Sequence, residues 1–271
     1  MHTPPTTHHL QHFFSPRSFN ILLAVMIAFI FWLAMYALST AIGTDHKSGF
    51  LLGLQRFVSV WGGQGISAFV KVTAYIACAY ALLDLREKSR LLQHEHQGFA
   101  QGVLPDQPGQ DQLVLSPDEV DDIKLSVVNR ERSGIFFWVN TLIKKTAAQY
   151  RNDRSVSDTL QVLDTQVEIG KNEQEGQLEV VRYIIQTVPM LGFIGTIVEL
   201  TASLSLINKP DYMALVSGSM ASAFDATLVA LALTILLTYR YHRHLESLDV
   251  FYARSKAYVL DNLVSRIYRA A

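Results

Sequence analysis

The 271-residue chain has little of the chemistry on which most enzymes depend. Its single cysteine, Cys78, excludes an intrachain disulfide, a thiolate metal cluster and a cysteine redox pair. The net charge of -1 gives no reason to expect binding to nucleic acid. The sequence also lacks a Walker phosphate-binding loop, paired metal ligands and a nucleophile with an identifiable base. It therefore does not predict an enzyme, and it predicts neither a bound metal nor a cofactor.

Charged side chains are scarce as well, at 17% of the residues, and they are unevenly distributed. Four apolar stretches together hold only three charges, Lys71, Glu199 and Asp225. A helix needs about 20 mostly apolar residues to span a bilayer. The first stretch is longer than the apolar core of about 7–15 residues in a signal peptide, which disfavours cleavage there. The sequence predicts an all-α membrane protein with four transmembrane helices, over residues 19–42, 66–83, 183–207 and 212–239.

Basic residues are concentrated on one side of the predicted spans. They follow the second and fourth spans and precede the third: Arg86, Lys88, Arg90, Arg182, Arg240 and Arg243. By the positive-inside rule, residues 1–18, 84–182 and 240–271 lie in the cytoplasm, and the loop 43–65 and the turn 208–211 lie outside. The apolar residues of the outside loop indicate either a short helix at the membrane surface or packing against neighbouring spans.

The long cytoplasmic loop is predicted to form a helical domain. Residues 93–115 are rich in proline, glycine and polar side chains, which predicts a flexible linker. A capping box, with serine at the N-cap, proline at the first helical position and glutamate at the third, predicts a helix start at Ser116. Two further helices are predicted, one over about 133–151 and one from Ser155 or Ser157 directly into the third span.

Two other features of the polar regions bear on function. His94 and His96 are weak evidence for zinc, because a two-residue spacing in a flexible loop has no third ligand nearby. Apolar residues recur at roughly the helical period through 240–271. This period predicts an amphipathic helix that packs on a neighbour or on residues 116–180.

The second span contains Lys71, which we interpret as a lysine that reaches the interface along its own stem.

The third and fourth spans contain many glycine, serine and threonine residues, unlike the first. Small residues let helices approach closely, and hydroxyls form bonds across an interface or line water. At about 100° per residue, Thr196, Glu199 and Ser203 share one stripe of the third span. Thr227 and Thr234 share a stripe of the fourth. Simple helix packing is the alternative explanation for any one small or hydroxyl residue.

The two carboxylates in these spans require a separate explanation. A carboxylate at membrane depth costs at least ~2.5 kcal/mol and commonly marks an ion path. Glu199 has three interpretations: it lines or gates an ion path, it forms a buried structural bond, or it lies in water near the outer interface. Asp225 points away from the stripe of Thr227, which suits a subunit contact or a buried bond between helices. Pro189 is expected to kink the third span.

Two segments of these spans carry a family resemblance. Val188–Val198, Val-Pro-Met-Leu-Gly-Phe-Ile-Gly-Thr-Ile-Val, resembles the signature that opens the first pore helix of the MotA/TolQ/ExbB proton-channel family. Ala223–Leu231, Ala-Phe-Asp-Ala-Thr-Leu-Val-Ala-Leu, resembles the second pore-helix signature. The likeness covers about 180–243. It departs from the family at Glu199, where the family usually has glycine.

The resemblance implies a homopentamer in the bacterial inner membrane that surrounds two copies of a single-span MotB/TolR/ExbD-like partner. An aspartate of that partner carries the proton or sodium ion, and the flow rotates the pentamer to drive a flagellar rotor, an outer-membrane receptor or the cell envelope. By motif position, the resemblance implies that Thr196 and Thr227 line the ion path. Because they share helical stripes with these threonines, Glu199, Ser203 and Thr234 are predicted to line it too. Helix packing or subunit contact is predicted for Pro189, Gly192, Gly195 and Asp225.

A second function remains open beside this one. In it, the chain is a membrane scaffold or sensor that oligomerises through its third and fourth spans. The cytoplasmic loop 84–182 then binds a partner protein. The four-span layout is closer to MotA, whereas the pore signatures are closer to ExbB and TolQ, so the resemblance does not identify the process that the motor drives.

Overall fold

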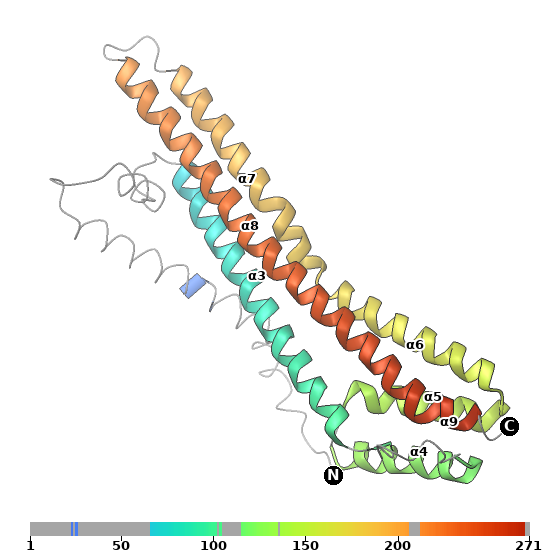
Figure 1. Ribbon diagram of the computed structural model, residues 1–271. Coiled ribbons are helices and arrows are strands. Elements are labelled where there is room, and N and C mark those ends of the chain that lie inside the picture. The colour runs from blue at the N-terminus through green and yellow to red at the C-terminus, as the bar shows by residue number, and fades with distance from the viewer. Residues whose placement is uncertain are drawn as a thin grey trace, which may run out of the picture. The chain divides into compact units, whose positions relative to one another are not determined.

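The computed structural model describes residues 66–101, 103–104, 115–134, 136–205 and 212–268, together with Leu23, Val25 and Met26. Every regular element in these residues is a helix, which confirms the predicted all-α class for this part of the chain (Figure 1). Most of the predicted first span, the loop 43–65 and the turn 208–211 lie outside the described residues.

The chain divides into two compact units. Unit 1 comprises Met1–Arg86 and Val180–His242, and unit 2 comprises Glu87–Glu179 and Arg243–Ala271. The division falls inside two of the helices, because α3 spans Ile66–His96 and α8 spans Tyr212–Val259. Each unit therefore contains part of both helices.

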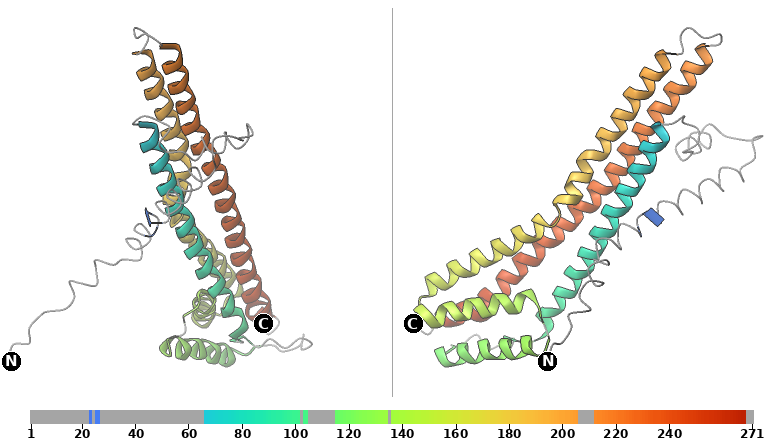
Figure 2. Two further views of the ribbon diagram at one scale, coloured as in Figure 1. Left: turned by 90° about the vertical axis from the view of Figure 1, so that its left-hand side faces the viewer. Right: turned by 180° about the vertical axis from the view of Figure 1, so that it is seen from behind.

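Unit 1 is a bundle of α3, α7 (Glu179–Leu204) and α8, which lie side by side in all views (Figure 2). Its apolar core draws on all three helices and consists of Ala74, Ala77, Ile184, Val188, Ala230 and Leu233. The small side chains in this core bring the helices close together. Pro189 lies inside α7, as predicted.

Two helical stretches among the described residues are long and apolar enough to cross a membrane, Val156–Leu204 and Val216–Ile267. They include the predicted third and fourth spans. The predicted second span, 66–83, forms the first part of α3 and is helical throughout. The four-span arrangement as a whole stays a prediction.

Unit 2 contains α4 (Pro117–Arg132), α5 (Trp138–Asp153) and α6 (Val156–Gly176). The predicted capping box at Ser116 is confirmed. The Ser116 N–H donates to Glu119 Oε2 at 2.7 Å, and the Glu119 N–H donates to Ser116 Oγ at 3.3 Å. Bonds to the backbone and side chain of Ser116 lower the pKa of Glu119.

The predicted continuous helix from Ser155 into the third span is wrong at one point. Ser155, one of the two predicted starts of this helix, caps α6, and its hydroxyl accepts from the Asp158 N–H at 3.3 Å. The helix then ends at Gly176, and a turn separates α6 from α7. Glycine is a poor helix former, and the Leu178 N–H donates to the Glu175 carbonyl at 2.9 Å within the turn.

The predicted flexible linker is wrong over its first part. The helix α3 continues to His96, and a 3₁₀ turn follows over Gln97–Gln101. Aromatic contacts explain the order, since the Phe99 ring packs on Phe251 and Tyr258. His94 stacks on Phe137, and His96 meets the edge of Phe251, so both imidazoles contribute to this aromatic packing. Residues 105–114 lie outside the described residues.

The last part of the chain packs on α5 and α6, which confirms one of the two partners predicted for it. The helix α8 runs to Val259, a π-helical turn covers Leu260–Val264, and α9 covers Ser265–Tyr268. The Tyr252 hydroxyl donates to the Gly170 carbonyl at 2.8 Å. The Trp138 ring covers Gly170 so closely that a Cβ there would lie 2.8 Å from it.

Candidate ion-path site

The candidate site in unit 1 begins with a close approach of α7 to α8 at Gly192. A Cβ added to Gly192 would lie 2.8 Å from the Ala230 Cβ and 3.2 Å from the Thr227 Cα. The second of these atoms belongs to the backbone, so it cannot move aside without shifting the helix. Glycine is therefore required for this spacing of the two helices.

Two threonines meet at this approach. The Thr196 hydroxyl on α7 is hydrogen-bonded to the Thr227 hydroxyl on α8. The Thr227 hydroxyl also lies 2.9 Å from the Gly192 carbonyl, and the Thr196 hydroxyl lies 3.3 Å from the Ala223 carbonyl. The structure thus brings the two threonines together in one hydroxyl and carbonyl network. Their role in ion movement stays a prediction.

The other hydroxyls on the predicted path do not join this network through the bonds described. Ser203 is buried, and its hydroxyl donates to the Glu199 carbonyl at 2.7 Å. Thr234 is half-buried, and its hydroxyl donates to the Ala230 carbonyl at 2.8 Å. Both bonds stay within one helix. Pro189, which is half-buried, precedes the close approach by three residues along α7.

Gly195 provides a second close approach, between α7 and α3. A Cβ there would lie 3.2 Å from the Val70 Cγ2, so this glycine also faces a neighbouring helix. Gly192 and Gly195 were both predicted to serve in helix packing or subunit contact. Within the chain, one contacts α8 and the other contacts α3.

The three charges of the apolar stretches lie near one another in unit 1. Glu199 is 5% exposed and Lys71 is 2% exposed, while Asp225 is half-buried. Lys71 on α3 interacts electrostatically with Asp225 on α8 and with Glu199 on α7. This burial contradicts the interpretation of Lys71 as an interface lysine, because a lysine that reaches headgroups along its stem would be exposed. It also contradicts the placement of Glu199 in water near the outer interface.

Sequence reasoning missed the part that Lys71 has in this cluster. The signal was present, because the four apolar stretches contain one cation and two anions and no other charge. Charges inside a membrane usually pair with one another. Asp225 interacts electrostatically with Lys71 on another helix, while the predicted subunit contact or hydrogen bond of Asp225 stays a prediction.

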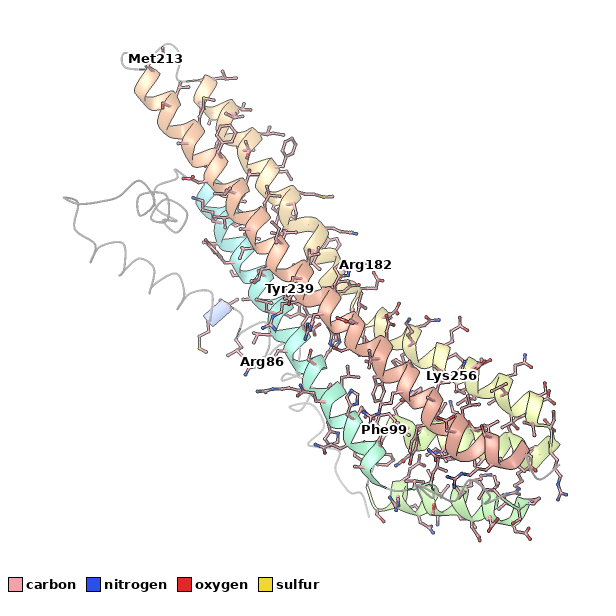
Figure 3. The ribbon with its side chains drawn as sticks, viewed as in Figure 1. Arg86, Phe99, Arg182, Met213, Tyr239 and Lys256 are labelled. Carbon is pink, nitrogen blue, oxygen red and sulfur yellow. The ribbon has the colours of Figure 1, made fainter. Side chains whose placement is uncertain are left out.

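One end of unit 1 is marked by basic residues. Figure 3 labels Arg86 on α3, Arg182 on α7 and Tyr239 on α8, and all three lie at the same end of the bundle, with Met213 at the other. Arg240 follows Tyr239 directly. The clustering at one end agrees with the asymmetry on which the positive-inside prediction depends.

Comparison with known proteins bears on these residues. Residues 138–255 match the model of the MotA/TolQ/ExbB proton channel family. The matched segment starts with α5 and includes α6, α7 and most of α8. It therefore contains both threonines and both carboxylates, whereas Lys71 lies outside it. Neither the comparison with curated proteins nor that with solved structures found a match.

Proposed function

Since residues 138–255 belong to the MotA/TolQ/ExbB proton channel family, we propose that the chain is the pore-forming subunit of an ion-driven motor. In this proposal α7 and α8 line a path for protons or sodium ions. A single-span partner subunit of the MotB/TolR/ExbD kind supplies the aspartate that carries the ion. The chain acts as a homopentamer around two copies of this partner.

The observation that carries the proposal is the threonine network between α7 and α8. Thr196 and Thr227 come from the two segments that resemble the pore signatures, and their hydroxyls are hydrogen-bonded to each other. Hydroxyls and a carbonyl at the depth of a membrane offer both donors and acceptors to a passing ion or to water. Hydroxyls also form bonds between packed helices, so the flux experiment below is designed to separate an ion path from helix packing.

The exposed faces of α7 and α8 support a membrane location and an assembly. Large apolar side chains are exposed on both helices: Met190, Phe193, Ile194, Ile197, Phe224, Leu228, Leu231 and Ile235. Contiguous apolar surface of this kind contacts lipid or another subunit. With the basic end of unit 1 in the cytoplasm, both termini lie there, and the membrane is the bacterial inner membrane.

Ion flux through the assembled complex tests the proposal. The complex with its single-span partner is reconstituted in vesicles, and flux is driven by a pH or sodium gradient. We expect Thr196→Val and Thr227→Val each to lower flux at least tenfold, equivalent to about 1.4 kcal/mol on the barrier, because each removes a hydroxyl of the network. The oligomer should remain intact, since valine is close to threonine in volume.

Thr201→Val is the matched control on α7. Thr201 is exposed, and its hydroxyl donates to the Ile197 carbonyl of its own helix at 2.8 Å. We expect its flux to equal that of the wild type. Normal flux in both Thr196→Val and Thr227→Val would reject the channel proposal. An intact oligomer without flux even in the wild type would support the membrane scaffold instead.

A further inference from the structure

The charge cluster of unit 1 extends the candidate site to a third helix. Lys71, Glu199 and Asp225 belong to α3, α7 and α8, and they are the charges of three otherwise apolar stretches. A lysine with only 2% of its surface exposed is rare, because an ammonium group buried without a counter-charge is very unfavourable. The carboxylates of Glu199 and Asp225 supply this counter-charge.

Helix packing places Lys71 at the cluster independently of its charge. Val70 contacts Gly195 across the α3 and α7 interface, at the close approach described above. Lys71 follows Val70 directly, and Glu199 lies one helical turn after Gly195 on the same face of α7. The buried Ala74, one turn after Val70, packs with Val188 and Ala230. The lysine is thus held at this level by contacts on either side of it.

The cluster also adjoins the threonine network. Glu199 lies one turn after Thr196 on the same stripe of α7, whereas Asp225 is two residues before Thr227 along α8 and lies on a different face of that helix. With one cation and two carboxylates, its formal charge is -1. An α7 and α8 pair without Lys71 would have a formal charge of -2 at the same place, in surroundings where a charge without a partner is strongly disfavoured.

We propose that Lys71 is a positioning residue for the ion path, which holds Glu199 and Asp225 and offsets one of their two charges. Each chain then presents one formal negative charge next to the threonine pair. The proposal rests on the proposed channel function, because ion flux through the complex is its readout. It assigns a role to α3, which lies outside the family-matched segment.

Variants that change the formal charge separate this role from a merely structural one. Lys71→Met gives a cluster of charge -2, and Glu199→Gln gives a charge of 0. The double variants Lys71→Met/Glu199→Gln and Lys71→Met/Asp225→Asn both restore -1. We expect flux at least tenfold below the wild type in the two single variants, and flux within threefold of the wild type in the two double variants. Cys78→Ala, another buried site on α3, is the control for packing changes and should retain wild-type flux.

The outcomes are measured as flux in vesicles, with the oligomer checked by native mass spectrometry. Wild-type flux in Lys71→Met would overturn the proposal. Double variants that do not assemble, or that conduct as poorly as an assembled Lys71→Met complex, would also overturn it. In either case, restoring the formal charge of -1 would not restore ion flux. If Lys71→Met alone does not assemble, recovery in the double variants supports the proposal. An inactive wild-type complex would instead reject the channel function itself.

Discussion

The two units of the chain distribute polar and apolar side chains in opposite ways. Unit 1 buries Lys71, Glu199 and Ser203 and exposes side chains such as Phe193. Unit 2 buries Val139, Ile143 and Leu163 and places ion pairs at its surface: Lys171 with Asp249 at 2.6 Å and Lys256 with Asp164 at 2.9 Å. This difference supports the proposal that unit 1 faces lipid or other subunits and that unit 2 faces water.

The largest expected effect of this contrast is at Leu228 on α8. Leu228 in unit 1 is 57% exposed, and Val250 in unit 2, on the same helix, is 59% exposed. An aspartate at the centre of a membrane helix costs about 3 kcal/mol, whereas a substitution at a water-exposed surface changes stability by about 0.5 kcal/mol or less.

We therefore expect Leu228→Asp to lower the amount of assembled protein in the membrane about a hundredfold. Val250→Asp should leave that amount unchanged. Quantitative immunoblotting of membrane fractions, followed by native electrophoresis, measures both. Equal amounts of the two variants would show that unit 1 does not face an apolar environment at this position.

The close approach at Gly192 offers a test of intermediate size. Gly192→Ala places a Cβ against Ala230 and the Thr227 backbone, so α7 and α8 must separate at a cost of about 1–3 kcal/mol. We expect the midpoint of thermal unfolding of the detergent-solubilised complex to fall, and ion flux to fall with it.

Gly218→Ala is the control for Gly192→Ala on α8, since a Cβ at Gly218 has no neighbouring atom within 4 Å. This variant should unfold at or above the wild-type temperature, because alanine favours a helix over glycine. A Gly192→Ala complex with the same midpoint and flux as Gly218→Ala would contradict the close packing of α7 on α8.

The smallest expected effect lies in unit 2, at Tyr252. Tyr252→Phe removes the hydrogen bond to the Gly170 carbonyl and should cost about 1 kcal/mol. Burial raises the pKa of Tyr252, and the nearby Glu173 and Glu95 raise it further. The folded unit therefore binds the phenol proton more tightly than the unfolded chain, in which the pKa is about 10.

The tyrosine's contribution to stability is then complete below pH of about 10, and it is lost as the pH rises above that value. Circular dichroism melts of the wild type and Tyr252→Phe measure it. The difference between the two melting temperatures should shrink between pH 9 and 11. A constant difference over this range would show that the phenol does not titrate on unfolding.

The sequence was most informative where a pattern is local. The capping box at Ser116, the cap at Ser155 and the two pore signatures depend on neighbours along the chain, and the helices form accordingly. The turn after Gly176 and the ordered start of the supposed linker were missed. The ordered structure of residues 93–101 depends on the contact of Phe99 with Phe251, which lies far away in the sequence.

The candidate site shows the same limit. Features within one helix were predicted from the sequence, whereas contacts between helices were not. Helical periodicity placed Thr196, Glu199 and Ser203 on one stripe, and each of them is buried in the structure. Periodicity within one helix says nothing about which helix the stripe faces. The pairing of Thr196 with Thr227, and the approach of Lys71 to the carboxylates, required the packing of three helices.

The electrostatic interaction of Lys71 with Glu199 and Asp225 also has an evolutionary consequence. Loss of either carboxylate changes the formal charge of the cluster from -1 to 0, and loss of Lys71 changes it to -2. If the charge of -1 is required, as proposed, selection acts on the three positions together. A descendant that replaces Glu199 with glycine, the usual residue in the family, is then under pressure to lose the lysine too. Positions 71 and 199 are expected to vary together among relatives, although only position 199 lies in the segment that matches the family model.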